Sequence, residues 1–454
     1  MRVALIYPLF PEYLLRVSLR SHEDFPAGLG YMAACLRRAG HTASIFTPDS
    51  LGMPMRRVWR EMAAFKPDIV GISAVTRNIM EARRVTGEVK RRLGCPVIMG
   101  GPHPTAVPRS TLEGLPELDA VIVGEGELPI LALAAEFDRN GKVNFGNVPG
   151  ACFLDKGSYV ENPRPEPIAD LDGLPYPAID LHNGGTVQLG NVKMFTSRGC
   201  PGQCNFCANI CMGRKFRPHS PERVVDEMEH MLKNYDARFL HIQDDCFTAD
   251  NKRAHRICDL IISRKLKIAW DAAGRVNTLL DEALLVKMKK AGCIRVQIGV
   301  ETGSQRINNL MGKGTTLEQA EQCCALLHKC GLESFPTFII GNDGETPETI
   351  KETIAFAKKL KPTITAFNTL IPFPGTAIFE KYYKDFDRPD TDWTGWCSQW
   401  PIRPYEPRQT KLSGTALWGY TVLAWFSYYG SPTRMLRILS GAFNWLNMSP
   451  KQSS

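Results

Sequence analysis

Four cysteines lie within one short stretch of the sequence, SRGCPGQCNFCANIC, at residues 197–211. Three of them, Cys200, Cys204 and Cys207, have the spacing C-x3-C-x2-C, and Cys211 follows. Closely spaced thiolates can hold a structural zinc ion or an iron–sulfur cluster, and paired thiols can form disulfides. The first residues, MRVALIYP, lack the pattern of a secretory signal. We therefore expect a cytoplasmic protein with reduced thiols, and metal ligation instead of disulfides.

The cysteine spacing separates the two kinds of metal site. Structural zinc sites commonly use two separated C-x2-C pairs, whereas this stretch contains a single C-x2-C unit. Three thiolates on a short loop can bind three irons of a [4Fe–4S] cluster and leave the fourth iron open to an outside ligand, while electron-transfer clusters are normally closed by four cysteines. Cys211 could close that corner; we expect it to be a thiol of the loop that does not bind the cluster.

The elements that would position these cysteines follow a β-α rhythm. Short apolar segments alternate with helical patterns after residue 190, and each apolar segment predicts a strand. Consecutive β-α units predict a partial (β/α)6 barrel, with its chemistry at the carboxyl ends of the strands. The predicted strands are residues 192–198, 237–245, 267–275, 294–301, 333–342 and 363–374.

An earlier β-α series precedes the barrel. It predicts a doubly wound parallel sheet, in which ligands bind beyond the carboxyl ends of the strands, so the whole chain is of the α/β class. Residues 146–190, which are rich in Pro, Gly and Asp, predict a linker between the two series. The strands predicted for the first sheet are residues 2–8, 42–48, 68–74, 96–101 and 120–127.

The tail, residues 386–454, breaks this pattern and is rich in tryptophan. No charged residue occurs from Leu412 to Pro432. Three structures suit such a segment: a membrane span, a helix lying on a membrane surface, or a lid or core helix packed on the barrel. The tryptophans are Trp393, Trp396, Trp400, Trp418, Trp425 and Trp445.

The composition is that of a folded protein with more than one domain. The chain has 454 residues, of which 44% are hydrophobic and 22% charged, and this length predicts two or three domains. Its net charge of +8 arises from scattered basic residues without a long Lys/Arg block, so we expect no nucleic-acid partner.

The cysteine motif, with Phe206 before its third cysteine and a barrel-like β-α series after it, resembles the radical S-adenosylmethionine (SAM) superfamily. The resemblance implies a [4Fe–4S] cluster on Cys200, Cys204 and Cys207, with SAM chelated to the open iron. It also implies reductive cleavage of SAM to a 5′-deoxyadenosyl radical, with electrons from an external reductant such as flavodoxin or ferredoxin.

Residues at later strand ends extend the resemblance. In the family, a carboxylate after the second strand meets the amino group of SAM, a basic residue meets its carboxylate, and further positions meet its ribose and adenine. An acceptor such as Asp244 or Asp245 suits an ammonium group. The residues that match these positions are Asp244, Asp245, Arg275, Glu301, Gly341 and Glu345.

The first sheet resembles the cobalamin-binding domain of the cobalamin-dependent branch of this superfamily, through DIVGISAVT, GGPHPT and VGEGE. Glycines there would let the backbone approach the corrin, and hydroxyls would bond its amides. The motif D-x-H-x-x-G does not occur within residues 1–145, and His103 is expected to be a turn residue, so no histidine is expected below the cobalt. The predicted cobalamin-binding residues are Ser73, Thr76, Gly100, Gly101, Gly124 and Glu125.

The resemblance implies an enzyme, and we expect a methyltransferase that moves a methyl group from methylcobalamin to an unactivated carbon of a hydrophobic or natural-product substrate. One alternative is a non-methylating oxidative cyclase of the magnesium-protoporphyrin monomethyl ester type. Another is a cobalamin-binding sensor without catalysis. We expect a cobalamin-binding domain at 1–145, a linker at 146–190, a radical SAM core at 191–385, and a substrate-binding, lid or membrane-surface region at 386–454.

Overall fold

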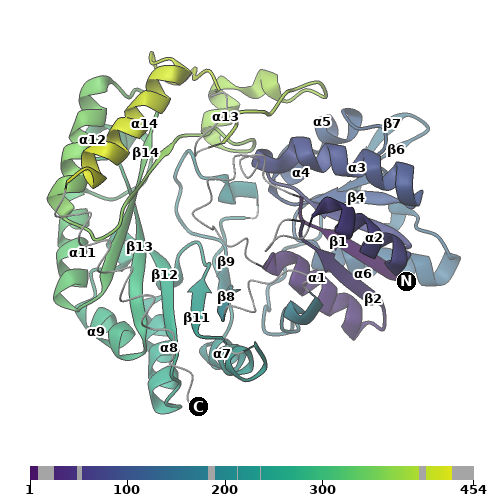
Figure 1. Cartoon of the computed structure of the whole chain (residues 1–454), viewed down its shortest axis with the longest axis horizontal. Coiled ribbons are helices and arrows are strands. Elements are labelled where there is room, and N and C mark those ends of the chain that lie inside the picture. Colours follow the sequence, from purple (N-terminus) through teal and green to yellow (C-terminus); the bar gives the residue numbers. More distant parts are fainter. Residues whose placement is uncertain are drawn as a thin grey trace. The chain divides into compact units, whose positions relative to one another are not determined.

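The computed structural model describes residues 1–8, 25–48, 54–181, 190–211, 213–235, 237–397 and 405–431. The chain divides into two compact units (Figure 1). Unit 1 contains Met1–Pro201, Phe206–Asp245 and Pro372–Arg403, and unit 2 contains Gly202–Asn205, Cys246–Ile371 and Pro404–Ser454. None of the helices in the described ranges is long and apolar enough to cross a membrane.

The first sheet lies in unit 1 and has seven strands in the order β2-β1-β3-β4-β5-β6-β7. Its first five strands pair in parallel and are almost wholly apolar and buried, as expected for strands covered on both faces. They are β1 (Arg2–Ile6), β2 (Thr42–Phe46), β3 (Ile69–Ser73), β4 (Val97–Gly100) and β5 (Ala120–Ile122), with helices α1 (Ala27–Arg38), α2 (Met55–Phe65), α3 (Ile79–Leu93), α4 (Pro102–Ala106), α5 (Pro108–Glu113) and α6 (Glu127–Asn140).

A hairpin within the predicted linker completes this sheet. Strands β6 (Ala151–Asp155) and β7 (Ser158–Glu161) pair antiparallel with each other, and β6 pairs antiparallel with β5. Lys156 and Gly157 both have positive φ, of 49° and 84°, which is the backbone of a two-residue hairpin turn. A Lys-Gly pair between two short segments was therefore the available sequence signal, and the linker prediction missed it.

The second sheet has six strands in the order β15-β14-β13-β12-β11-β8. This order, with parallel pairing of β8 with β11 and of β12 through β15, confirms the predicted partial barrel. The strands are β8 (Asn191–Met194), β11 (Phe239–Ile242), β12 (Ala269–Arg275), β13 (Cys293–Glu301), β14 (Glu333–Ile340) and β15 (Ala366–Thr369), with helices α7 (Pro221–Tyr235), α8 (Asn251–Ser263), α9 (Glu282–Lys290), α10 (Gln305–Leu310), α11 (Leu317–Lys329) and α12 (Pro347–Leu360).

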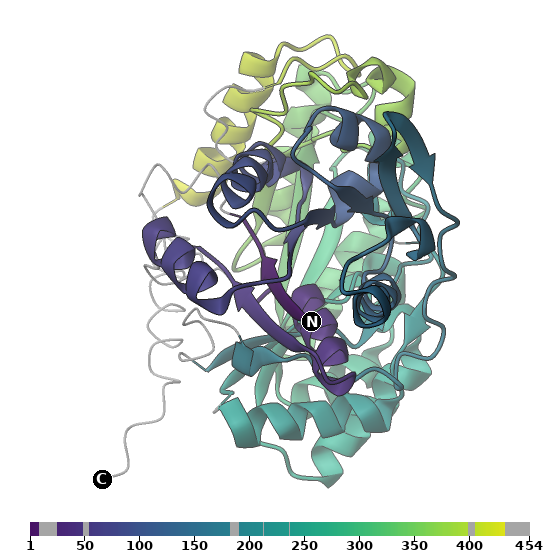
Figure 2. The same ribbon diagram turned by 90° about the vertical axis from the view of Figure 1, so that its right-hand side faces the viewer.

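The tail forms helix α14 (Gly414–Tyr429), which lies against β15 and α12 in unit 2 and is yellow in Figure 1 and Figure 2. Trp425 donates a hydrogen bond to the carbonyl of Phe367 at 2.9 Å, and the hydroxyl of Tyr429 donates to the carbonyl of Thr365 at 2.6 Å. Of the three structures considered for the tail, these contacts match a helix packed on the barrel. Trp400 and Trp445 lie outside the described residues.

Candidate cluster and cofactor site

The cysteine loop begins and ends at a short antiparallel ladder in unit 1. Strand β9 (Ser197–Arg198) pairs with β10 (Arg217–Pro218), and Arg198 stands opposite Arg217. Gly199 follows β9 with φ of 81°, and a side chain there would collide with the carbonyl of Lys215. The ladder and this glycine therefore set the direction in which the chain enters the cysteine motif.

The three cysteines of the motif differ in exposure. Cys204 is buried, Cys200 is half-buried and Cys207 is exposed, and none of the three forms a disulfide. Cys211 ends the short helical turn η6 (Ala208–Cys211), and its side chain lies outside the described residues.

The donor set suits an iron–sulfur cluster by its chemistry. Across the described ranges, no three His, Cys, Asp or Glu side chains are grouped to hold a single metal ion. Cluster cysteines bind separate irons instead of surrounding one ion, and soft thiolates are the ligands that such clusters use. The assignment of Cys200, Cys204 and Cys207 as cluster ligands stays a prediction that this donor set fits.

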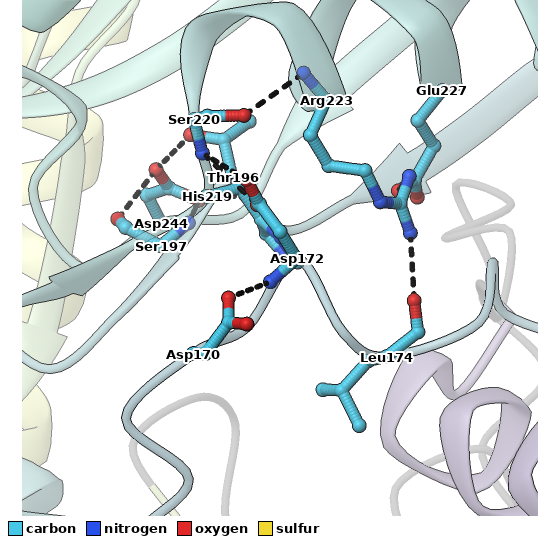
Figure 3. Close-up of polar contacts among 10 residues, drawn as sticks. All are labelled: Asp170, Asp172, Leu174, Thr196, Ser197, His219, Ser220, Arg223, Glu227 and Asp244. Carbon is cyan, nitrogen blue, oxygen red and sulfur yellow. Dashed lines mark hydrogen bonds and ion pairs between the residues drawn. The ribbon is translucent and has the colours of Figure 1, made fainter.

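Asp244 is buried beside Thr196 and Ser197, and its carboxylate is occupied by their donors (Figure 3). Its carboxylate accepts hydrogen bonds from the backbone N–H groups of Thr196 and Ser197, at 2.6 and 3.1 Å, and from both hydroxyls. Asp245 is exposed, and its Oδ2 accepts a bond from Asn209 at 2.8 Å. Asp244 and Asp245 were the two carboxylates considered as acceptors for the ammonium group of SAM, and the greater accessibility of Asp245 favours it for this role.

Glu125 binds the base of the cysteine loop, although the sequence suggested a cobalamin contact for it. Its carboxylate pairs with Arg217 at 2.5 Å and with Arg198 at 3.3 Å, and Arg198 also pairs with Glu127 at 2.6 Å. Burial alone would raise the pKa of Glu125, but hydrogen bonding to Arg217 and the charge of Arg198 outweigh it and hold that pKa below its ordinary value. The loop base is thus neutralised within unit 1.

The predicted cobalamin residues do lie at one edge of the first sheet, beyond the carboxyl ends of β3, β4 and β5. Gly101 has φ of 101°, and a Cβ there would lie 2.6 Å from the carbonyl oxygen of Ala74. Gly124 has φ of 87°, and its N–H donates to the hydroxyl of Thr105 at 3.1 Å. Gly100 ends β4, and a Cβ there would lie 3.4 Å from the carbonyl oxygen of Ile122. The fold itself therefore favours glycine at these positions, whether or not a ligand approaches them.

The two hydroxyl residues of this edge differ in accessibility. Ser73 is half-buried, whereas Thr76 is buried with its hydroxyl 3.0 Å from Nδ1 of His103. His103 is also buried, and its ring packs edge-on against Trp393 at 4.9 Å. Burial lowers the pKa of His103 to about 3, so this histidine is neutral. Helix α4, which contains it, contacts η6 of the cysteine loop within unit 1.

In unit 2, Glu301, the predicted SAM-binding residue that matches the family's ribose position, is part of a buried ion pair. Glu301 ends β13 with an unusual φ of 71°, and Nζ of Lys313 lies 2.9 Å from its Oε1. Both residues are buried. Lys313 was not among the predicted site residues, because nothing in MGKGT marks it as the partner of a strand-end carboxylate.

The end of β14 is closed by a second buried carboxylate. Oε2 of Glu345 accepts hydrogen bonds from the N–H groups of Gly341 and Asn342, at 2.5 and 2.9 Å. Within the described chain, its Oε1 has no partner. Burial raises the pKa of Glu345 to about 7. The side chain of Gln409 donates to the carbonyl of Gly341 at 2.7 Å, so the tail helps to hold this turn.

Two family models match the chain: the radical SAM superfamily at residues 194–357 and the B12 binding domain at residues 20–134. An uncharacterized methyltransferase of Pyrococcus horikoshii, PH0819, is 34% identical over 84% of this chain and 83% of its own length. The chain belongs to the radical SAM superfamily. It is a member of the branch that carries a B12-binding domain before the radical SAM domain.

Other similarities agree with this assignment. The anaerobic magnesium-protoporphyrin IX monomethyl ester cyclase of Rubrivivax gelatinosus is 31% identical over 78% of this chain and 66% of the cyclase. The structure of the radical SAM methyltransferase TsrM from Kitasatospora setae, with cobalamin and a [4Fe–4S] cluster bound, matches with a TM-score of 0.69 and 20% identity, over 84% of this chain and 75% of TsrM. That likeness supports the fold.

The predicted fold class, the superfamily and the enzymatic nature of the chain are confirmed by these matches. The expected cofactors, a [4Fe–4S] cluster, SAM and cobalamin, are those of the two matched domains, and the expected class of cobalamin-dependent radical SAM methyltransferase is confirmed at the level of the family. The individual site residues and the domain boundaries stay predictions.

The contrast between the two aspartates can be tested directly. We expect Asp245→Asn to keep its full iron content and to weaken SAM binding by about tenfold, because one charge-assisted contact is lost. We expect Asp244→Asn to lose iron and thermal stability, because an amide cannot accept all four bonds. Iron content per chain and equilibrium dialysis of SAM measure both effects. An Asp244→Asn variant that keeps iron but loses SAM would assign Asp244 to the ligand instead.

A polar cluster also joins the segment before β8 to the start of α7 (Figure 3). Asp172 accepts a hydrogen bond from the N–H of Ser220 at 3.0 Å, and Arg223 donates to the carbonyl of Leu174. Arg223 also pairs with Glu227 at 2.7 Å. Glu227 is buried, and burial raises its pKa to about 7 against the opposing effect of Arg223.

This raised pKa predicts a pH-dependent stability. Because the folded state binds the Glu227 proton more tightly than the unfolded state, wild-type stability should fall as pH rises from the ordinary glutamate pKa through about 7. The difference in free energy of unfolding between Glu227→Gln and wild type should therefore shift in favour of the variant by on the order of 2 kcal/mol from pH 5.5 to pH 8.5, as measured by urea unfolding. The exposed pair Glu321–Lys359 supplies the control, Glu321→Gln, which should show no such trend. If the stability of Glu227→Gln relative to wild type instead falls from pH 5.5 to pH 8.5, the ion pair with Arg223 outweighs the cost of burying the Glu227 charge.

Proposed function

We propose that this protein is a cobalamin-dependent methyltransferase that acts on an unactivated carbon of a hydrophobic substrate. When bound, the cluster, SAM and cobalamin supply an electron, a hydrogen-abstracting radical and a transferable methyl group. The observation that carries the proposal lies in unit 1, where α4 of the B12-binding domain contacts η6 of the cysteine loop. A short distance between the two reaction centres is what methyl transfer to a substrate radical needs.

In this proposal, residues of the chain would bind the cluster and SAM. Cys200, Cys204 and Cys207 would hold the cluster, and the exposed Asp245 would accept hydrogen bonds from the ammonium of SAM. Arg275, half-buried at the end of β12, is the cation available for the carboxylate of SAM. An external one-electron donor such as flavodoxin or ferredoxin would reduce the cluster.

The relatives support a bulky and largely apolar substrate. The Rubrivivax gelatinosus cyclase is named for a magnesium porphyrin ester, and its 31% identity extends over most of this chain. On the strand face of unit 2 that is only partly buried, neighbouring positions of β12, β13 and β14 are Ala273, Gln297 and Phe335. These three side chains are uncharged, and the charged pair Asp271–Arg295 lies beside them on the same face, which suits an apolar group with a few polar substituents. An isoprenoid lipid or a tetrapyrrole has this chemistry.

A labelled methyl donor tests the reaction. The reconstituted full chain, supplied with SAM carrying a deuterated methyl group and extracts of its own cells, should yield a product heavier by one labelled methyl. The Cys204→Ala variant should abolish that product, because a cluster ligand is lost. A product formed without label would favour cyclisation, and a cluster-loaded chain that releases no 5′-deoxyadenosine would favour a cobalamin sensor.

We also propose that the outer face of α14 contacts a membrane surface. Trp418, Leu423 and Phe426 on this helix are 38%, 50% and 69% exposed, and no residue of the helix is charged. Exposed apolar side chains that gather on one helix face are typical of interaction sites, and aromatic residues suit the headgroup boundary. This contact would give the enzyme access to an apolar substrate.

A membrane contact through α14 can be distinguished from non-specific binding through other exposed apolar residues. Replacing Trp418, Leu423 and Phe426 together with serine should lower co-sedimentation with anionic lipid vesicles severalfold, because the apolar face is removed. The control replaces Leu128, Leu154 and Ile262 with serine; these residues are 44%, 44% and 41% exposed and lie on other elements. Equal binding by the α14 variant and wild type would refute the contact. Melting curves verify that both variants fold.

A further inference from the structure

Arg275 makes a direct contact with the motif's most buried cysteine, in addition to any contact with SAM. Its Nη1 donates a hydrogen bond to Sγ of Cys204 at 3.6 Å, a normal distance when sulfur is the acceptor. Its Nη2 donates to the carbonyl of Lys313. Both bonds lie within unit 2, which contains Cys204 and its neighbours as well as β12. The guanidinium is therefore held between the sulfur and a backbone carbonyl.

The turn that holds Arg275 also holds the chain directly after Cys204. The N–H of Asn205 donates to the carbonyl of Met311 at 3.0 Å, and its side-chain amide donates to the carbonyl of Leu310 at 2.9 Å. Lys313, in the same turn, is fixed by its buried pair with Glu301. Cys204 and its arginine are thus positioned by one framework, so the N–H to sulfur contact is fixed by its surroundings.

A cationic donor at a ligand sulfur affects the charge balance of a cluster. Reduction adds one negative charge, which spreads onto the sulfurs, and a nearby N–H group with a positive charge stabilises it. Cys204 is only 8% exposed, so water screens this interaction weakly. Hydrogen bonds to ligand sulfurs and burial are among the factors by which a protein sets cluster potential.

We infer that Arg275 is a positioning residue that raises the reduction potential of the cluster through Cys204. The inference rests on the proposed function, since it requires a cluster on the cysteine loop. It is independent of the expected contact between Arg275 and the SAM carboxylate, because it concerns the cluster before SAM binds. Arg275 would then make the cluster easier to reduce by an external donor.

Potentiometric titration without SAM tests this role. The full chain, reconstituted anaerobically with iron and sulfide, is titrated with dithionite and mediators while the reduced cluster is followed by electron paramagnetic resonance. In Arg275→Gln the equilibrium constant for one-electron reduction should fall about tenfold, which is about 59 mV toward more negative potential. Arg275→Lys keeps the charge but loses the planar fork, so its fall should be smaller.

A matched control removes the same charge elsewhere. Arg256 is exposed on α8, and Arg256→Gln should leave the midpoint unchanged. Iron content and circular dichroism verify that each variant is folded and loaded. If Arg275→Gln does not retain a cluster, Arg275→Lys provides the comparison with wild type.

Two results would overturn the inference. One is an Arg275→Gln midpoint equal to that of wild type; if the variant also loses the spectral change caused by adding SAM, Arg275 acts on SAM alone. The other is a midpoint shift of equal size in Arg256→Gln, which would show that the effect comes from the net charge of the protein and not from the contact with Cys204. A wild-type chain that assembles no cluster would refute the proposed function itself, and is recognised from its iron content before any titration.

Discussion

The buried ion pairs of Glu125 with Arg198 and Arg217 are the interaction on which the cysteine loop depends. The two arginines stand opposite each other in the ladder that closes the loop, so without a shared anion their charges would repel. Glu125 follows β5 of the first sheet, which fixes the loop base to the B12-binding domain. Removing one member of such a group would leave an uncompensated buried charge, which is far more costly than the net strength of the pairs.

Much of the fold could be predicted because hydrophobic periodicity depends on the nearest neighbours in sequence. Parallel strands covered on both faces read as apolar runs, and the order of such runs was enough to predict a doubly wound sheet followed by a partial barrel. The β6–β7 hairpin was missed because its strands are short and partly exposed, as in Leu154, Tyr159 and Val160, and lie in a stretch whose Pro, Gly and Asp content predicted a linker.

The site was only partly predictable, for a different reason. The cysteine spacing is local and could be recognised directly, whereas the partner of a buried carboxylate is chosen by the fold. Glu125 meets Arg217 across 92 positions of the chain, and no pattern in either segment indicates that pair. Lys313 is closer in sequence to Glu301, but the two meet through the positive φ that ends β13. Sequence motifs therefore located the edge of each sheet better than they assigned a function to each residue.

The carboxylates of these motifs show how charge is distributed around the site. Asp244, Glu125 and Glu301 are buried and bound by hydroxyls, backbone N–H groups or cations of the chain itself. An anion satisfied in this way would lose those bonds on turning to a ligand, so it serves the framework more effectively than the cofactor. Asp245 is exposed and accepts bonds from the side-chain amide of Asn209 and the backbone N–H of Gly199, so its exposed carboxylate can still accept hydrogen bonds from an ammonium group. Within unit 1, the buried anions thus hold the base of the loop, while Asp245, which follows Asp244 in the sequence, stays accessible for binding.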